Sequence, residues 1–242
     1  MYDNLPVVKL GLVATSRDCF PIQLSAKRKA AVVDAYTKAG GEIVDIPTII
    51  ESENDAMKAL RTGDRELARS IFENDHVANE LELTIERQSM RILLSEQPVA
   101  GDLRTISTAL KMITDMERIS DQGADISEIL THIPTDEKGP DILYTMADKC
   151  VIMVSKAMDA FIGRDLELAR AVSDADSEID RLFTMARSEL TGRITQKPDE
   201  AALWLDFFMI AKYLERIGDH AQNIAEWVEF LVTGMHKHQR IL

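Results

Sequence analysis

The sequence of 242 residues has few aromatic side chains and only two cysteines. The two cysteines, Cys19 and Cys150, form no CxxC pair, so neither a disulfide scaffold nor a cysteine zinc site is expected. No apolar run reaches the roughly 18 residues that a membrane-spanning helix needs. The N-terminus lacks a basic segment followed by a long apolar run, which argues against a secretory signal. We expect a soluble, cytoplasmic protein.

Positive charge is also scarce. The chain has 28 basic and 41 acidic residues, hence a net charge of −13, and its pI is near 4.9. A phosphate backbone repels such a chain, so nucleic acid is not an expected partner, whereas metal cations and basic protein surfaces are. The sequence also lacks a nucleophile–base arrangement, a glycine-rich phosphate loop and a GxSxG turn. No catalytic residues are predicted, and an enzyme is not expected.

From about residue 55 the sequence has a helical pattern, and its low aromatic content of 5% is typical of helix bundles. A linker with two prolines, residues 132–140, separates two halves, 53–134 and 140–242. Each half is predicted to be an antiparallel three-helix bundle, which makes the fold mainly α. The predicted helices are 49–61, 64–95, 102–130, 141–161, 165–191 and 199–233, with breaks at 62–64, 163–164 and 191–192.

The first 52 residues have a different pattern. Residues 7–14 and 42–46 are rich in β-branched and other apolar side chains, and both are predicted to be strands. Ser25 can cap a helix over 26–39, which Gly40 and Gly41 end. Strand, helix and strand together predict a short βαβ segment, which takes the place of most of the first bundle's first helix.

An acidic motif, Glu-Arg-Ile-x-Asp, occurs at 117–121 and again at 215–219, 98 residues later. Residues four apart share one face of a helix, so each copy displays a ladder of oxygens. Because the ladders flank the apolar seams, we expect them on an exposed face. The preceding helices carry a second pair, Asp176 with Asp180 in one half and Asp75 with Asn79 in the other. The candidate metal ligands are Asp75, Glu117, Asp121, Asp125, Asp176, Asp180, Glu215, Asp219 and Asn223.

Two interpretations of these ladders compete. Hard oxygen ligands suit Mg, Ca, Mn or iron, and the duplication of the motif favours a metal site. Acidic residues four apart are also common on solvated helix surfaces, and Arg118 and Arg216 could neutralise them without metal. His220 is expected to be a solvated side chain rather than an extra ligand. His236 lies in the expected C-terminal tail and is predicted to have no role.

Three long stretches, 97–104, 110–122 and 214–226, resemble the PhoU family of phosphate-transport regulators. The resemblance covers about residues 55–242. It implies two three-helix bundles with multinuclear clusters of iron or zinc on their E(D)xxxD motifs. It also implies a cytoplasmic negative regulator that links the phosphate-specific ABC transporter to a sensor histidine kinase. Asn79 departs from the family pattern, because an acid is expected there.

The first 55 residues resemble the N-terminus of L-fucose/L-arabinose isomerase-like proteins, in residues 9–21 and in Lys27 and Arg28. That family's metal and catalytic residues lie beyond such a fragment, so the resemblance implies no isomerase activity. A PhoU chain normally opens with a long helix, of which only about 52–61 remains here. The apolar seams of 64–95 and 102–130 would then face water. We therefore predict that residues 20–60 or a partner chain complete the first bundle, and we expect a homo-oligomer such as a homodimer.

Three functions are consistent with these patterns. The first is a metal-binding regulator of phosphate uptake. The second is a metal-dependent enzyme, either a phosphohydrolase or a sugar isomerase, and the third is a helical scaffold that binds no metal. The lack of a nucleophile, a base and a phosphate loop argues against the enzyme, and the duplicated ladder argues against the plain scaffold. We favour the regulator.

Overall fold

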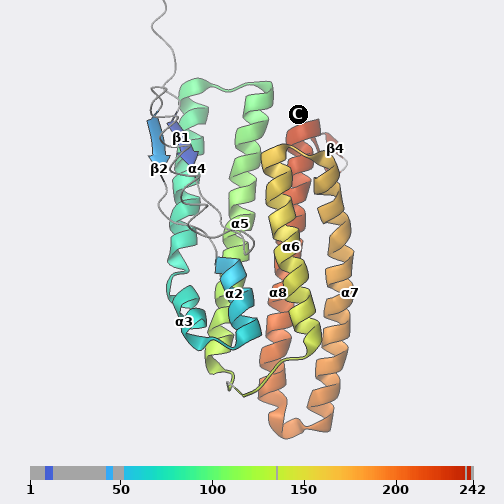
Figure 1. Ribbon diagram of the computed structural model, residues 1–242. Helices are drawn as coiled ribbons and strands as arrows, with labels where there is room; N and C mark the ends of the chain where they lie inside the picture. Colours follow the sequence, from blue (N-terminus) through green and yellow to red (C-terminus); the bar gives the residue numbers. More distant parts are fainter. Residues whose placement is uncertain (1–8, 13–41, 46–51, 135, 238, 241–242) are drawn as a thin grey trace, which may run out of the picture. The chain divides into compact units, whose positions relative to one another are not determined.

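The computed structural model describes residues 9–12, 42–45, 52–134, 136–237 and 239–240. The chain divides into two compact units, residues 1–54 and 55–242. The second unit is a bundle of long, roughly parallel and antiparallel helices (Figure 1). None of the helices in the described ranges combines the length and the hydropathy required to cross a bilayer.

Among its described residues, the first unit contains the strands β1 (Lys9–Leu12) and β2 (Glu42–Asp45). The strands are parallel, and Lys9 lies opposite Glu42 while Leu12 lies opposite Asp45. Both strands fall within the segments predicted to be extended. Parallel neighbours need a crossover connection. The helix predicted over 26–39 lies outside the described residues.

The second unit confirms the mainly α fold. The helices of its first half are α2 (Ser52–Thr62), α3 (Arg65–Glu73), α4 (His76–Glu96) and α5 (Ala100–His132). The second half contains α6 (Asp141–Gly163), α7 (Leu166–Gln196), the 3₁₀ turn η1 (Pro198–Glu200) and α8 (Ala201–Thr233). The two-residue strands β3 (Met235–His236) and β4 (Gln239–Arg240) follow as an antiparallel pair.

Two boundary predictions were wrong. The predicted helix 64–95 is divided into α3 and α4 at Asn74 and Asp75. The Asn74 side chain donates to the carbonyl of Ser70 at 2.7 Å, and such side-chain bonds compete with the helical backbone ladder. The break predicted at 191–192 lies inside α7, which continues to Gln196. It is Pro198 that prevents further helix, because proline disfavours the helical conformation of the residue before it.

The start of the second helix is built alike in both halves. The Asp64 carboxylate accepts a hydrogen bond from the backbone N–H of Leu67 at 3.0 Å, and Asp165 does the same for Leu168 at 3.0 Å. Each aspartate therefore satisfies an N–H that has no partner within its own helix. Because 165 and 64 differ by 101, as do Asp176 and Asp75, the two caps are equivalent positions of the internal repeat.

In the second half, α6, α7 and α8 pack against one another, and α8 also packs against α5 of the first half (Figure 1). The predicted seam of α8 forms the core, since Leu214, Ile217 and Ala221 are fully buried. Helix α8 thus meets three neighbouring helices, and the core is continuous between the two halves.

The first half has a shorter first helix, as the sequence predicted. Ala56, Met57 and Leu60 of α2 are buried in the common core. Arg61 extends from the end of α2 to α6, where it pairs with Asp148 and donates to the carbonyl of Tyr144 at 3.4 Å. The expectation that residues 20–60 complete the first bundle is thus met only for Ala56, Met57 and Leu60. Residues 20–41 and 46–51 lie outside the described ranges. With 11 residues, α2 is about half as long as α6, its counterpart of 23 residues.

Candidate metal centre

One group of predicted ligands converges between α7 and α8. Asp180 lies on α7, and Glu215 and Asp219 lie one turn apart on α8. One oxygen from each carboxylate lies within 4.8 Å of the other two, a spacing that a single cation could bridge. Exposed acidic groups often cluster without metal, so the convergence alone decides nothing.

Asp176 supplies a second and independent observation at this cluster. Its side chain lies one turn from Asp180, only 8% of the residue is exposed, and its Oδ1 has no hydrogen-bond partner among the described residues. Burial, followed by repulsion from Asp180, Asp219 and Glu215, raises the pKa of Asp176 to about 6. A buried carboxylate oxygen without a partner is costly, and a bound cation would remove that cost.

Gly218 permits this arrangement. A Cβ at Gly218 would lie 3.2 Å from the Ile179 side chain and 3.4 Å from Oδ1 of Asp176. The glycine therefore allows α7 and α8 to approach closely where the Asp176 carboxylate lies between them. The equivalent position of the first half, 98 residues earlier, is Ser120, which is buried.

Within the α8 ladder, Glu215 is not on an open face, which corrects the sequence-based expectation for this residue. Only 14% of the Glu215 side chain is exposed, and this side chain pairs with Lys212. The expectation considered one apolar seam, whereas α8 packs against α5, α6 and α7, so little of its circumference is free. Burial and the neighbouring Glu215 raise the pKa of Asp219, although Lys212 opposes this.

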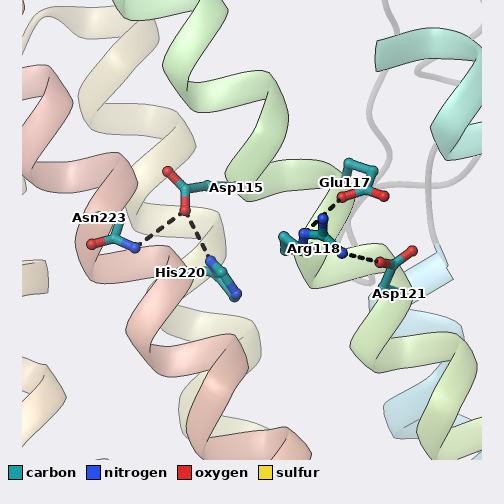
Figure 2. A network of polar contacts seen from close by, with 6 residues as sticks. All are labelled: Asp115, Glu117, Arg118, Asp121, His220 and Asn223. Carbon is teal, nitrogen blue, oxygen red and sulfur yellow. Dashed lines mark hydrogen bonds and ion pairs between the residues drawn. The ribbon is translucent and has the colours of Figure 1, made fainter. Parts of the chain in front are cut away.

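The first half contains a second acidic cluster, formed by Asp75, Glu117, Asp121 and Asp125. Burial raises the pKa values of Asp75, Glu117 and Asp125, and repulsion from Asp121 is the next cause for each. Arg118 pairs with Glu117 at 3.3 Å and with Asp121 at 3.1 Å, as Figure 2 shows. The predicted neutralisation by arginine is therefore confirmed for Arg118. Asn79, which replaces an acid here, is half-buried.

Two predicted ligands are turned towards the other half of the molecule. The Asn223 side chain does not continue the ladder of Asp219 but donates to Asp115 of α5 at 3.2 Å (Figure 2). Asp125 lies in the first cluster, yet it also lies close to Tyr213 of α8, where its charge, after burial, raises the pKa of that phenol. Each step of four residues overshoots a full helical turn by about 40°, so the third member of a ladder is rotated by about 80° from the first. Both third members consequently lie at the α5–α8 contact.

The sequence interpretation missed Asp115 and misjudged His220. The Nδ1 atom of His220 lies 2.9 Å from Oδ1 of Asp115, so this histidine is a partly buried hydrogen-bonding partner rather than a solvated side chain (Figure 2). The sequence shows Asp115 only as an acid two residues before Glu117, and nothing local indicates that it contacts a residue 105 positions away. Glu226, which adds to the repulsion on Asp176, was also missed.

Replacing Asp115 by alanine is expected to lower the free energy of unfolding by about 1–3 kcal/mol, because His220 and Asn223 then lose their shared acceptor. Urea unfolding followed by circular dichroism measures the loss. Glu128, exposed on the same helix, is the control, and Glu128→Ala should change stability by less than about 0.5 kcal/mol. Equal losses for the two variants would contradict the proposed role of Asp115.

The C-terminal end is more structured than the expected tail. The ring of His236 stacks on Trp227 with a centroid distance of 3.9 Å, and Lys237 pairs with Glu226 at 3.1 Å. On its α5 side, Trp227 lies 6.0 Å from the Lys111 ammonium. The prediction that His236 is incidental was wrong, because this residue attaches the terminal strands to α8.

Comparison with known proteins decides the family. A model of the PhoU domain matches residues 48–130 and 143–228, one copy in each half of the repeat. This chain belongs to the PhoU family. A second model, that of the fucose/sulfoquinovose isomerase N-terminal domain, matches residues 11–72. The second match is consistent with the isomerase resemblance of the first 55 residues, but it covers only about a quarter of the chain.

Individual PhoU relatives resemble the chain over the same region. The PhoU homologue of Clostridium acetobutylicum, named a phosphate-specific transport system accessory protein, is 33% identical over 184 residues, 74% of this chain and 84% of the relative. The crystal structure of PhoU from Pseudomonas aeruginosa superposes with a TM-score of 0.72 at 34% identity, covering 76% of this chain and 90% of that one. The crystal structure of the phosphate transport system regulatory protein PhoU from Streptococcus pneumoniae superposes with a TM-score of 0.71 at 25% identity. The match covers 77% of this chain and 88% of that one.

Proposed function

We propose that this protein is a regulatory accessory protein of phosphate uptake whose acidic clusters bind metal ions. Membership of the PhoU family supports the regulatory role, since the relatives are named as accessory and regulatory proteins of phosphate transport. The chain is a regulator and not an enzyme on the same grounds. The finer proposal is that it acts in the cytoplasm as a negative regulator, between the phosphate ABC transporter and a sensor histidine kinase.

The observation that supports metal binding best is the buried Oδ1 of Asp176, which has no described partner and lies beside Asp180, Glu215 and Asp219. We propose these four carboxylates as ligands of the second half, and Asp75, Glu117, Asp121 and Asp125 as ligands of the first. All are hard oxygen donors, which suit iron, Mg, Mn or Ca; a zinc cluster is the other possibility. Lys212 and Arg118 already neutralise part of each cluster, so they would turn away when a cation binds.

In this proposal the protein's own residues hold the cation and couple it to the fold. Asp176, between α7 and α8, would join the two helices through the metal, and the metal would supply the positive charge that now comes from Lys212. Because bound metal stabilises only the folded state, loading would raise the melting temperature. Helices fixed in this way present a defined surface to the transporter or the kinase.

The test is metal analysis by mass spectrometry after reconstitution with iron, zinc, Mn, Mg or Ca in turn. The Asp180→Asn/Asp219→Asn variant is expected to lose the metal of the second half, because amides are neutral and weak ligands. Asp174→Asn, an exposed change on α7, is the matched control and should bind as the wild type does. Metal-free wild-type protein under every condition would refute the metal proposal.

The regulatory proposal has its own test. In a bacterium lacking its own PhoU homologue, expression of the full chain should restore repression of a phosphate-starvation reporter at high phosphate. Unchanged reporter activity, with the protein shown to be folded and present, would contradict it. Hydrolysis of p-nitrophenyl phosphate by the metal-loaded protein, abolished in Asp180→Asn/Asp219→Asn, would instead favour the phosphohydrolase.

A further inference from the structure

The outer face of α4 carries large apolar side chains that nothing in its own bundle explains. Leu83, Met90 and Leu94 are 46%, 56% and 83% exposed. At about 100° per residue the three fall within a sector of about 40° on one side of the helix. The buried residues of α4, Leu81 and Ser89, lie on the opposite side and face the core with α5.

The internal repeat shows that the fold does not require apolar residues on this face. The equivalent positions of α7, 101 residues later, are Thr184, Ser188, Thr191 and Thr195, and all four are exposed. They correspond to Leu83, Arg87, Met90 and Leu94. Hydroxyl side chains therefore suffice on the same surface of the sister helix. A contiguous apolar surface that the fold does not need is typical of an interaction site.

Charged residues flank this stripe in a definite pattern. Glu86, Arg87, Met90, Arg91, Leu94 and Ser95 line a shallow groove on the surface of α4. In heptad notation, Leu83 and Met90 occupy d positions, and Arg87 and Leu94 occupy a positions. Glu86 then falls at g and Arg91 at e, on opposite flanks of the stripe. In two parallel helices, g of one faces the following e of the other, five residues on.

We propose that α4 pairs in parallel with α4 of a second copy of this chain. Leu83, Met90 and Leu94 of the two copies would cover one another, and Glu86 of each copy would pair with Arg91 of the other, which gives two symmetric ion pairs. An antiparallel pair would bring g towards g and e towards e, so that neither Glu86 nor Arg91 would meet an opposite charge. The charge pattern thus selects both the occupant and its direction.

The contact is small and reversible. It involves about two heptads of one helix per subunit, less than the roughly 800 Å² per partner of a standard interface. Arg87 at an a position weakens the pair further, as polar residues there do, while it specifies the register. We expect a dissociation constant on the order of 10–100 μM, and the pairing needs neither bound metal nor the proposed regulatory function.

Sedimentation equilibrium of the full chain at concentrations from about 1 μM to about 1 mM tests the pairing. This range brackets the expected dissociation constant of the dimer. The wild type should dimerise reversibly. Met90→Thr/Leu94→Thr, which copies the residues of α7, should weaken dimerisation at least tenfold while leaving the melting temperature of the monomer unchanged. A wild type that stays monomeric at 1 mM would overturn the proposal.

Charge exchange distinguishes parallel α4 pairing from any other dimer. Glu86→Arg and Arg91→Glu should each weaken self-association about tenfold, because each creates two like-charge contacts. The double variant should recover wild-type dimerisation, and an equimolar mixture of the two single variants should form heterodimers. A dimer that tolerates both single exchanges, or that the double exchange does not restore, would place the interface elsewhere and refute the proposal.

Discussion

Phe207→Ala is expected to cost about 3–5 kcal/mol of unfolding free energy, because it removes a large buried side chain. Phe207 is 2% exposed on α8, and its ring lies 5.9 Å from that of Trp204. The linker packs onto it so closely that a Cβ at Gly139 would lie 2.8 Å from the phenyl ring. Removing the ring would leave a cavity where the linker between the halves, α6 and α8 meet.

Denaturant unfolding, followed by circular dichroism at 222 nm as is usual for helices, measures this loss. Leu205→Ala is the matched control, because Leu205 is two residues away on the same helix and 53% exposed. Its replacement should cost less than about 0.5 kcal/mol. Comparable losses for Phe207→Ala and Leu205→Ala would show that the linker and α8 do not share a close-packed core.

The second large effect concerns Asp176 and depends on pH. The pKa of this carboxyl is about 6 in the folded protein and 3.8 in its unperturbed state. Between these values the folded state binds more protons than the unfolded state, so the stability of the metal-free protein falls as pH rises from about 4 to about 6. Asp176→Asn cannot ionise and should be more stable than the wild type by about 1–2 kcal/mol at pH 7, with no gain below pH 4.

Melting temperatures from pH 4 to pH 8 in the presence of a chelator give the comparison. Asp174→Asn, exposed on the same helix, should leave the pH profile unchanged. Saturating metal should reverse the order, because the charged carboxylate of the wild type then has its cation while the amide of the variant does not. If the melting temperatures of wild type and Asp176→Asn change in parallel with pH in the presence of chelator, the raised pKa of Asp176 is contradicted.

The helices and the acidic residues could be predicted because each depends on short-range periodicity. The seam residues Leu214, Ile217 and Ala221 recur at the spacing of a buried helix face, and all are fully buried. The two copies of the acidic motif revealed the repeat. Periodicity does not predict how many other helices pack around each helix. With three neighbours, α8 partly buries Glu215 and turns Asn223 and His220 towards α5.

The break between α3 and α4 and the terminal strands were missed for related reasons. Asn74 and Asp75 lie within an otherwise continuous helical pattern in the sequence. In the structure, the Asn74 side chain donates a hydrogen bond to the Ser70 carbonyl at the break between α3 and α4. His236 is positioned by the stacking of its ring on Trp227. Neither contact leaves a periodic signal in the sequence.

The polar contacts along α5 and α8 also limit how the two halves can move. Lys111 with Trp227, Asp115 with His220 and Asn223, and Asp125 with Tyr213 follow one another along the same pair of helices. A sliding motion of a fraction of a turn would break all of these contacts at once and would offer no replacement. These contacts therefore favour movement of α5 and α8 as one rigid body over sliding of one helix along the other.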